Sequence, residues 1–144
     1  MAEQFPLGLI GEATTKVAPE LTARHLGSGT VSVFATPEMV RLMERAAVNG
    51  LAPHLAPGQQ SVGTLVNVKH LAATPLGATV TARAELLAVD GRRLTFRVTA
   101  HDGADLIGEG FHERALIDLA RFEAKVKVKA EAEAKAERGG LSSE

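Results

Sequence analysis

The sequence predicts an α+β domain in which one long helix packs on an antiparallel sheet. Residues 36–51 carry apolar side chains at helical spacing. Residues 61–120 contain long runs in which apolar and polar residues alternate, as they do in half-buried strands. Two Asp-Gly dipeptides, at 90–91 and 102–103, divide these runs and are typical of hairpin turns.

Strands are expected on both sides of the helix. The short ones are expected at 12–19 and 28–36, and the long ones at 61–75, 78–90, 92–102 and 105–120. Strict alternation in 61–75 places Val62, Val66, Val68 and His70 on one face, and Gly63 on the other. Because short turns separate the long segments, we expect a four-stranded antiparallel meander.

The helix at 36–51 raises a question about one acidic residue. Its apolar stripe consists of Val40, Met43, Ala47 and Leu51, and Glu44 falls in the middle of that stripe. Removing a carboxylate from water costs several kcal/mol unless the charge is paired. Glu44 is therefore a member of a buried ion pair or a functional acid, unless the helix is rotated by one position.

A single helix with a strong apolar stripe must pack on the one sheet available. We therefore expect the sheet to wrap around the helix, which is the hot-dog fold. This layout leaves one sheet edge and one face uncovered, so we also expect a homodimer. The predicted domain spans 1–122, and the Ala-, Lys- and Glu-rich segment 123–144 is a predicted tail, helical or disordered.

Composition excludes several classes of function. The chain of 144 residues has a formal net charge of −1 and only 3% aromatic residues, so neither nucleic acid nor an anionic membrane surface is an expected partner. It has no cysteine, which excludes thiol chemistry. No apolar run is long enough to cross a bilayer, and residues 1–11 do not resemble a signal peptide. We expect a cytoplasmic protein.

Two further polar residues could carry chemistry. Thr36 precedes Pro37 where a helix N-cap is expected, so it is either an ordinary cap or a hydroxyl placed in the positive field of the helix N-terminus. His70 lies on the strand face that the helix is expected to cover. A base and an orienting acid directed at one core suit hydrolysis of an activated acyl group. Backbone N–H groups at the helix N-terminus are the expected oxyanion hole.

The remaining histidines do not form a metal site. His25, His54, His101 and His112 lack the spacing of known metal-binding motifs. Residues 108–110 (Gly-Glu-Gly) are not followed by the Lys and Ser or Thr of a phosphate-binding loop. We therefore expect neither a metal nor another cofactor.

Three segments carry a specific resemblance to a known family. They are "ATPEMVRLMERAA", "GTLVNVKHLAATPLGATVTARAEL" and "DGRRLTFRVTAHDGADLIGEGFHERALI". In order and spacing, over about residues 22–122, they resemble the fluoroacetyl-CoA thioesterase family of hot-dog proteins. The resemblance implies hydrolysis of a small or medium acyl-CoA, with Thr36, Glu44 and His70 as a catalytic triad. It also implies that Gly63 binds substrate at a dimer interface and that Arg114 lies near the site.

One segment departs from the family pattern. The fluoroacetate-specific member has a longer stretch before the helix, with phenylalanines that form a lid over the acyl pocket. Here that stretch is the short "HLGSGTVSVFAT", in which Gly27, Ser28 and Gly29 replace the insertion. We therefore expect acyl-CoA hydrolysis without fluoroacetyl selectivity.

Spacing leaves the arrangement of the triad open. Thr36 and Glu44 are eight residues apart, which is about 12 Å along a helix axis. Either His70 contacts Thr36 while Glu44 acts from farther along the pocket, or the site is shared across a dimer.

Two other functions also remain: a non-catalytic hot-dog protein that binds acyl-CoA or another small ligand, and an enoyl-CoA hydratase, whose usual acid and histidine spacing is absent.

Overall fold

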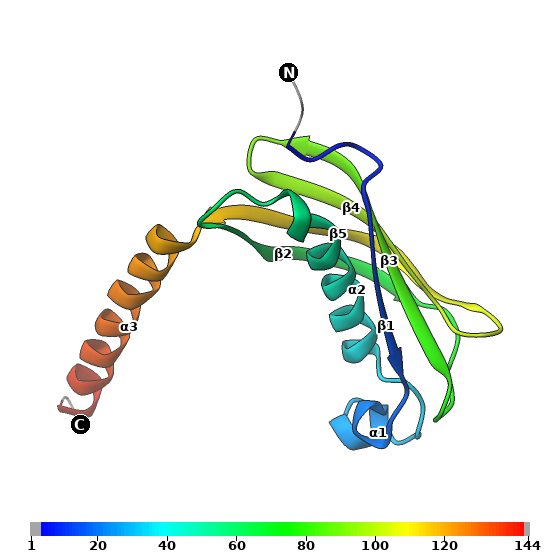
Figure 1. Cartoon of the computed structure of the whole chain (residues 1–144). Coiled ribbons are helices and arrows are strands. Elements are labelled where there is room, and N and C mark those ends of the chain that lie inside the picture. Colours follow the sequence, from blue (N-terminus) through cyan, green and yellow to red (C-terminus); the bar gives the residue numbers. More distant parts are fainter. Residues whose placement is uncertain (1–3, 143–144) are drawn as a thin grey trace.

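A curled antiparallel sheet wraps around one long helix in the computed structural model, which describes residues 4–142 (Figure 1). This confirms the predicted hot-dog fold. The strands are β1 (Ile10–Lys16), β2 (Gln59–His70), β3 (Thr79–Asp90), β4 (Arg93–His101) and β5 (Leu106–Asp118). The helices are α1 (Ala23–Leu26), α2 (Thr36–Leu51) and α3 (Leu119–Ser142), with short 3-10 turns at Pro19–Leu21 and Ala52–His54.

The strand order corrects the predicted meander. The sheet runs β1-β3-β4-β5-β2, so only β3, β4 and β5 follow one another as neighbours. β2 pairs with β5, and the chain then crosses to the other half of the sheet before β3 begins. The Asp-Gly dipeptides form the two turns as predicted, and Gly91 adopts a left-handed φ of 60°. β2 therefore lies at an edge of the sheet.

The segment expected to be a strand at 28–36 is irregular. It follows α1, a short helix that the sequence pattern did not reveal, and Gly27 ends that helix with φ at 74°. Within residues 4–142, its only strand-like pairings are isolated bridges from Phe34 to Thr22 and from Val33 to Pro75. A left-handed glycine and a second glycine at 29 prevent regular pairing here.

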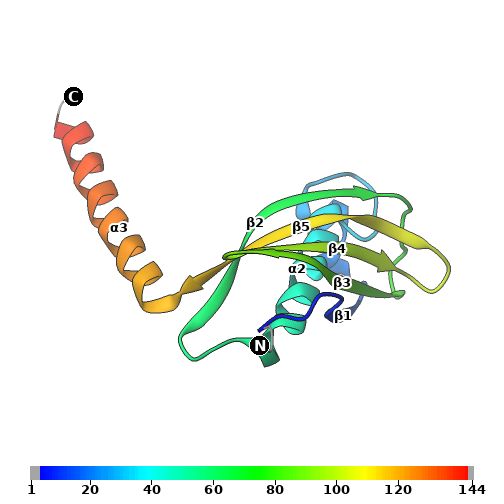
Figure 2. The ribbon, with the colours of Figure 1, turned by 90° about the horizontal axis from the view of Figure 1, so that it is seen from above.

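Helix α2 packs on the concave face of the sheet (Figures 1 and 2). Its buried residues are Met39, Leu42, Met43, Ala46, Ala47, Gly50 and Leu51. They pack with the buried side chains of β3, β4 and β5 in one hydrophobic core. The centre of the buried stripe is thus rotated from the predicted one, and Glu44 lies at its border.

Two glycines let α2 approach β1 closely. A Cβ added to Gly11 would lie 2.0 Å from the Ala46 carbonyl oxygen and 2.5 Å from the Gly50 backbone nitrogen. A Cβ added to Gly50 would lie 3.0 Å from the Gly11 backbone. All of these neighbours are backbone atoms, which cannot move aside as a flexible side chain can.

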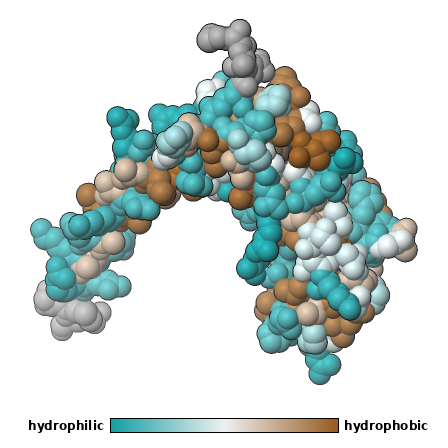
Figure 3. All heavy atoms as spheres, in the orientation of Figure 1, coloured by the Kyte–Doolittle hydropathy of each residue, from teal (hydrophilic) through white to brown (hydrophobic). Residues whose placement is uncertain are grey.

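Helix α3 continues directly from β5 and extends away from the sheet (Figures 1 and 2). Its side chains from 119 to 139 are exposed, and polar and apolar ones are interspersed along it (Figure 3). The division into a domain of 1–122 and a tail of 123–144 stays a prediction. Residues 1–3 of that domain and residues 143–144 of that tail lie outside the described residues. Within residues 4–142, no helix combines the length and hydrophobicity that a membrane span requires.

We predict that Gly11→Ala destabilises the fold, because the new methyl group would overlap backbone atoms of α2. Overpacking of this kind lowers the free energy of unfolding by about 1–3 kcal/mol, and by more where backbone atoms must move. Urea denaturation measures the effect. Gly103→Ala is the matched control, because a Cβ there meets no atom within 4 Å. Equal stability of the two variants would contradict the close approach of β1 and α2.

Candidate active site

Thr36 and His70 form a hydrogen-bonded pair at the start of α2. The Thr36 hydroxyl lies 2.7 Å from His70 Nδ1. Thr36 is brought there by the first turn of α2, and His70 by the end of β2, where the Leu71 N–H donates to the Ile107 carbonyl of β5. Because Nδ1 can accept the hydroxyl proton, the pair has the geometry of a hydroxyl and its base.

Thr36 does not cap the helix, which corrects one of the two sequence interpretations. The N-cap is Ala35, and the Thr36 side chain makes no capping hydrogen bond. Pro37 has no N–H, and the N–H groups of Glu38 and Met39 both donate to the Ala35 carbonyl. Among the described residues, the Thr36 N–H is the one donor of this turn left without an acceptor, fewer than expected for an oxyanion hole at this end.

His70 is held as a neutral base by its surroundings. Burial lowers the pKa of His70, and the Ala72 backbone acts in the opposite direction. Its Nε2 atom is buried and has no hydrogen-bond partner among the described residues. A buried polar atom of this kind is expected to meet a ligand or a water molecule.

A hollow of about 350 Å³ opens beside this pair. Its lining residues are mostly small or apolar: Ala23, Ser28, Val33, Phe34, Thr36, His70, Leu71, Ala72 and Ala73. The short Gly-rich segment after α1 therefore forms one wall of it, and the end of β2 forms another. The size and lining suit a small apolar group placed next to a hydroxyl and an imidazole.

The sequence pattern predicted Glu44 in the middle of the buried stripe, but the structure places it outside the core. Its side chain is 40% exposed, because the buried stripe of α2 is centred on other residues. One carboxylate oxygen lies 3.6 Å from the Arg114 guanidinium, whose side chain is only 7% exposed. Glu44 is thus the accessible end of an ion pair whose other member is fixed in the sheet.

Arg114 is held by three more hydrogen bonds. Its Nε donates to the Ser61 hydroxyl at 2.8 Å, and its second terminal nitrogen donates to the Ser61 carbonyl at 3.0 Å. The nitrogen that faces Glu44 also lies 3.2 Å from His112 Nε2. Burial lowers the pKa of Arg114, and the Glu44 carboxylate opposes this effect. The guanidinium is therefore fixed on all sides by β2, β5 and α2.

A bulge in β2 corrects the predicted strand faces. Gly63 pairs with Arg114 and Leu65 pairs with Glu113, so Thr64 is an extra residue in β2. The extra residue reverses the alternation, and Gly63 therefore faces Glu44 rather than the outer side of the sheet. A Cβ added to Gly63 would lie 2.7 Å from Glu44 Oε2, which leaves no room for a larger residue without displacing the carboxylate.

The structure does not bring the whole predicted triad together within one chain. Thr36 contacts His70, whereas Glu44 contacts Arg114 and adjoins Gly63. Eight residues of α2 separate the two groups, about 12 Å along its axis. One chain thus holds two half-sites, a Thr36–His70 pair and a Glu44–Arg114 pair.

Ser61 and His112 are site residues that the sequence pattern did not reveal. The spacing of His112 excludes it from a metal site, and the structure shows it 1% exposed and hydrogen-bonded to Arg114. The period-two pattern of β5 was the available signal, because it places His112, Arg114 and Leu116 on one face. Ser61 could not be found this way, since the bulge at Thr64 determines its face.

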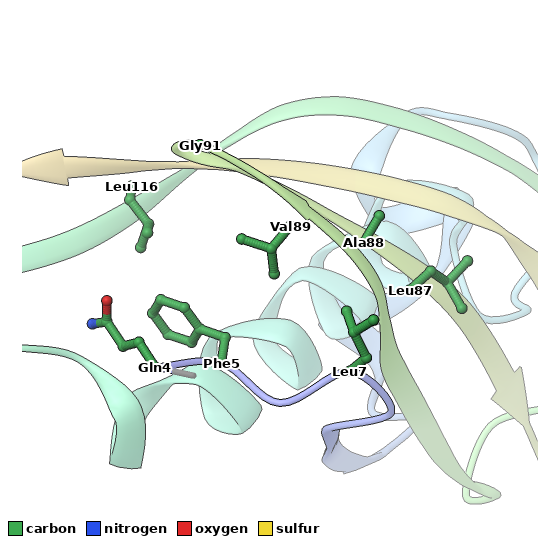
Figure 4. A pocket seen from close by; sticks show the side chains of 8 residues that line it. All are labelled: Gln4, Phe5, Leu7, Leu87, Ala88, Val89, Gly91 and Leu116. Atoms are coloured by element: carbon green, nitrogen blue, oxygen red, sulfur yellow. The ribbon is translucent and has the colours of Figure 1, made fainter. Parts of the chain in front are cut away.

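Other features of the surface are separate from these residues. Among residues 4–142, no group of three or more His, Asp or Glu side chains is placed to hold a metal ion. A larger hollow, about 490 Å³, lies between the N-terminal segment and the β3–β4 hairpin (Figure 4). It is lined by Gln4, Phe5, Leu7, Leu87, Ala88, Val89, Gly91 and Leu116, none of which titrates. Chemistry is therefore expected at the smaller hollow.

Comparisons with known proteins show the family of this chain. A family model described as fluoroacetyl-CoA-specific thioesterase matches residues 17–120. The fluoroacetyl-CoA thioesterase of Streptantibioticus cattleyicolor is 52% identical over 127 residues, covering 82% of this chain and 91% of that protein. A solved fluoroacetyl-CoA thioesterase structure has a TM-score of 0.81 at 50% identity, covering 86% of this chain and 96% of its own. A thioesterase superfamily member from Thermus thermophilus has a TM-score of 0.83 at 34% identity, with coverages of 90% and 97%.

We predict that the buried imidazoles make the fold less stable in acid. Burial lowers the pKa of both His70 and His112, whereas in the unfolded chain each titrates near about 6.5. The stability that their neutral forms contribute is complete above about pH 6.5 and is lost as pH falls through the folded-state pKa values. Urea denaturation across this range measures the slope.

The double variant His70→Gln with His112→Gln should flatten that slope, because neither glutamine titrates. His101→Gln, at an exposed position of β4, is the control for loss of any histidine. An unchanged slope in the double variant would assign the acid sensitivity to other groups.

Proposed function

Because the chain belongs to the fluoroacetyl-CoA-specific thioesterase family and is a thioester hydrolase, we propose that it hydrolyses coenzyme A thioesters of small or medium acyl groups. The observation that carries this proposal is the 2.7 Å contact between the Thr36 hydroxyl and His70 Nδ1 beside an apolar hollow. The hollow of about 350 Å³ supports a short acyl chain. Its small lining residues would contact that chain.

We propose that this chain is not selective for the fluoroacetyl group. Residues 27–33 contain no aromatic residue, and Phe34 is almost fully buried, so neither can close over the acyl group as a mobile lid. Acetyl, propionyl and butyryl groups should therefore be accepted along with fluoroacetyl. The coenzyme A portion would extend from the mouth of the hollow.

Thr36 is the proposed nucleophile. Its hydroxyl proton passes to His70 Nδ1 as the oxygen attacks the thioester carbonyl, and the Thr36 N–H is placed to stabilise the oxyanion. The carbon–sulfur bond then breaks, and His70 returns the proton to the departing thiolate. Water attacks the resulting ester, a base accepts the water proton, and the acyl–oxygen bond to Thr36 breaks with return of a proton to Thr36. The products are the free acid and coenzyme A.

Glu44 is the proposed base for the water, acting in the site of a second copy. Its carboxylate is partly exposed and lies about 12 Å along α2 from Thr36 of the same chain. β2 supports a dimer, because it is a free sheet edge of twelve residues that exposes Leu65 and Val66. Pairing along this edge would place Gly63 and the Glu44–Arg114 pair of each subunit near the other subunit.

We expect Thr36→Ala, His70→Ala and Glu44→Gln each to lower turnover, by about 100-fold or more for His70→Ala and Glu44→Gln. Release of free thiol measures turnover across acetyl-, fluoroacetyl-, butyryl-, hexanoyl- and benzoyl-CoA. Circular dichroism tests whether each variant remains folded. Wild-type rates in both Glu44→Gln and His70→Ala would refute the proposed site.

The same variants test the nucleophile. Glu44→Gln should accumulate an acyl group on Thr36, because attack on the thioester persists while water is poorly activated. Intact-protein mass spectrometry detects the added mass, and the double variant with Thr36→Ala is the control. No acyl adduct in Glu44→Gln would mean that water attacks the thioester directly and that Thr36 only positions it.

Mixing two inactive variants tests the shared site. Thr36→Ala and Glu44→Gln chains, unfolded and refolded together, should regain about a quarter of the wild-type turnover, because half of the dimers are mixed and each has one intact site. Each variant refolded alone is the control. No recovery in the mixture would place Thr36 and Glu44 in the same subunit's site.

A further inference from the structure

His112 is a buried imidazole that the proposed mechanism does not use. It lies on β5 and is 1% exposed, with its ring stacked near Phe96 at 6.3 Å between centroids. Buried polar side chains in the core are usually hydrogen-bonded, and His112 uses both ring nitrogens.

Its two contacts determine which nitrogen carries the proton. Nδ1 lies 2.8 Å from the Leu65 carbonyl oxygen, which can only accept, so Nδ1 carries the hydrogen. Nε2 lies 3.2 Å from Arg114, whose guanidinium can only donate, so Nε2 presents its lone pair. A protonated ring would direct an N–H at another N–H.

We infer that His112 is a positioning residue for the thioesterase reaction: as a neutral acceptor it fixes the Arg114 nitrogen that pairs with Glu44. The inference rests on the proposed function of Glu44. The same Arg114 nitrogen contacts both His112 and Glu44, so a change at His112 alters the direction of the donor that faces the carboxylate.

His112 also connects this pair to the bulge in β2. Leu65, which accepts the Nδ1 hydrogen, follows the extra residue Thr64, and Gly63 precedes it. A Cβ at Gly63 would lie 3.3 Å from the His112 ring. One imidazole therefore fixes the positions of both the bulge and the guanidinium, and both of them adjoin the Glu44 carboxylate.

The charged groups around the ring are consistent with the neutral form. Burial lowers the pKa of His112 most, the Leu65 backbone raises it, Arg114 lowers it and Glu44 raises it. Arg114 and Glu44 are the charged groups that face the ring, from β5 and α2 respectively. The neutral acceptor is therefore expected to persist at neutral pH.

Three substitutions separate the two hydrogen bonds. His112→Gln can place an amide oxygen near the former Nε2 and keep an acceptor for Arg114. His112→Asn can keep a donor near the Leu65 carbonyl but is too short to reach Arg114. His112→Leu fills the space without either bond. We expect kcat to fall about tenfold or more in the Leu and Asn variants, as small displacements of catalytic groups do, and to recover in Gln.

The expected loss is in kcat rather than in KM, because His112 does not touch the hollow that would bind the acyl group. Val98→Ala, which removes methyl groups from the core on β4, is the control for lost stability and should keep the wild-type kcat. Wild-type kcat in the Leu variant, or equal kcat in Gln and Asn, would overturn the inference.

A spectroscopic measurement gives a result that does not depend on turnover. In 15N-histidine-labelled protein at pH 7, the resonances lost in His112→Gln should report a neutral ring protonated at Nδ1. An imidazolium, or a ring protonated at Nε2, would overturn the inference while leaving the thioesterase proposal intact. No turnover of any acyl-CoA by the wild-type chain would instead refute the proposed function, and this role of His112 with it.

Discussion

The close packing of α2 against β1 supports both half-sites. Gly11 and Gly50 let the two backbones meet without side chains between them, and this contact determines how deeply the helix lies in the curled sheet. Thr36 begins that helix, and Glu44 lies two turns farther along. The depth and rotation of α2 therefore determine whether Thr36 reaches His70 and whether Glu44 reaches Arg114. Interiors are close-packed, so a small shift of the helix would alter both contacts together.

The bulge in β2 has a comparable effect on the sheet. One extra residue, Thr64, reverses the alternation, so that Gly63 and His70 both face α2 although seven residues separate them. Without the bulge, one of the two would face outward. Bulges often occur at sheet edges and near active sites, where they redirect side chains. Here the bulge is also held from β5, where His112 donates to the Leu65 carbonyl.

Much of the fold followed from local patterns in the sequence. The period of α2, the alternation in β3, β4 and β5, and the turns at Asp90-Gly91 and Asp102-Gly103 were predicted, because each depends on residues close together in the chain. The irregular segment at 28–36 was predicted wrongly as a strand, because left-handed Gly27 and the short helix α1 have no periodic pattern. The family resemblance came from motifs, and the comparisons confirmed it.

The sequence by itself determined the long strands, the amphipathic helix α2, and the presence of a hydroxyl and a carboxylate on that helix and of an imidazole on a long strand. Only the tertiary structure decided which of them meet. The position of β2 beside β5, the bulge at Thr64 and the rotation of α2 all depend on contacts between residues far apart in the chain. Periodicity is a local property and does not report such contacts. For that reason the pairing of Thr36 with His70 and of Glu44 with Arg114, and the position of His112 behind them, became visible only in three dimensions.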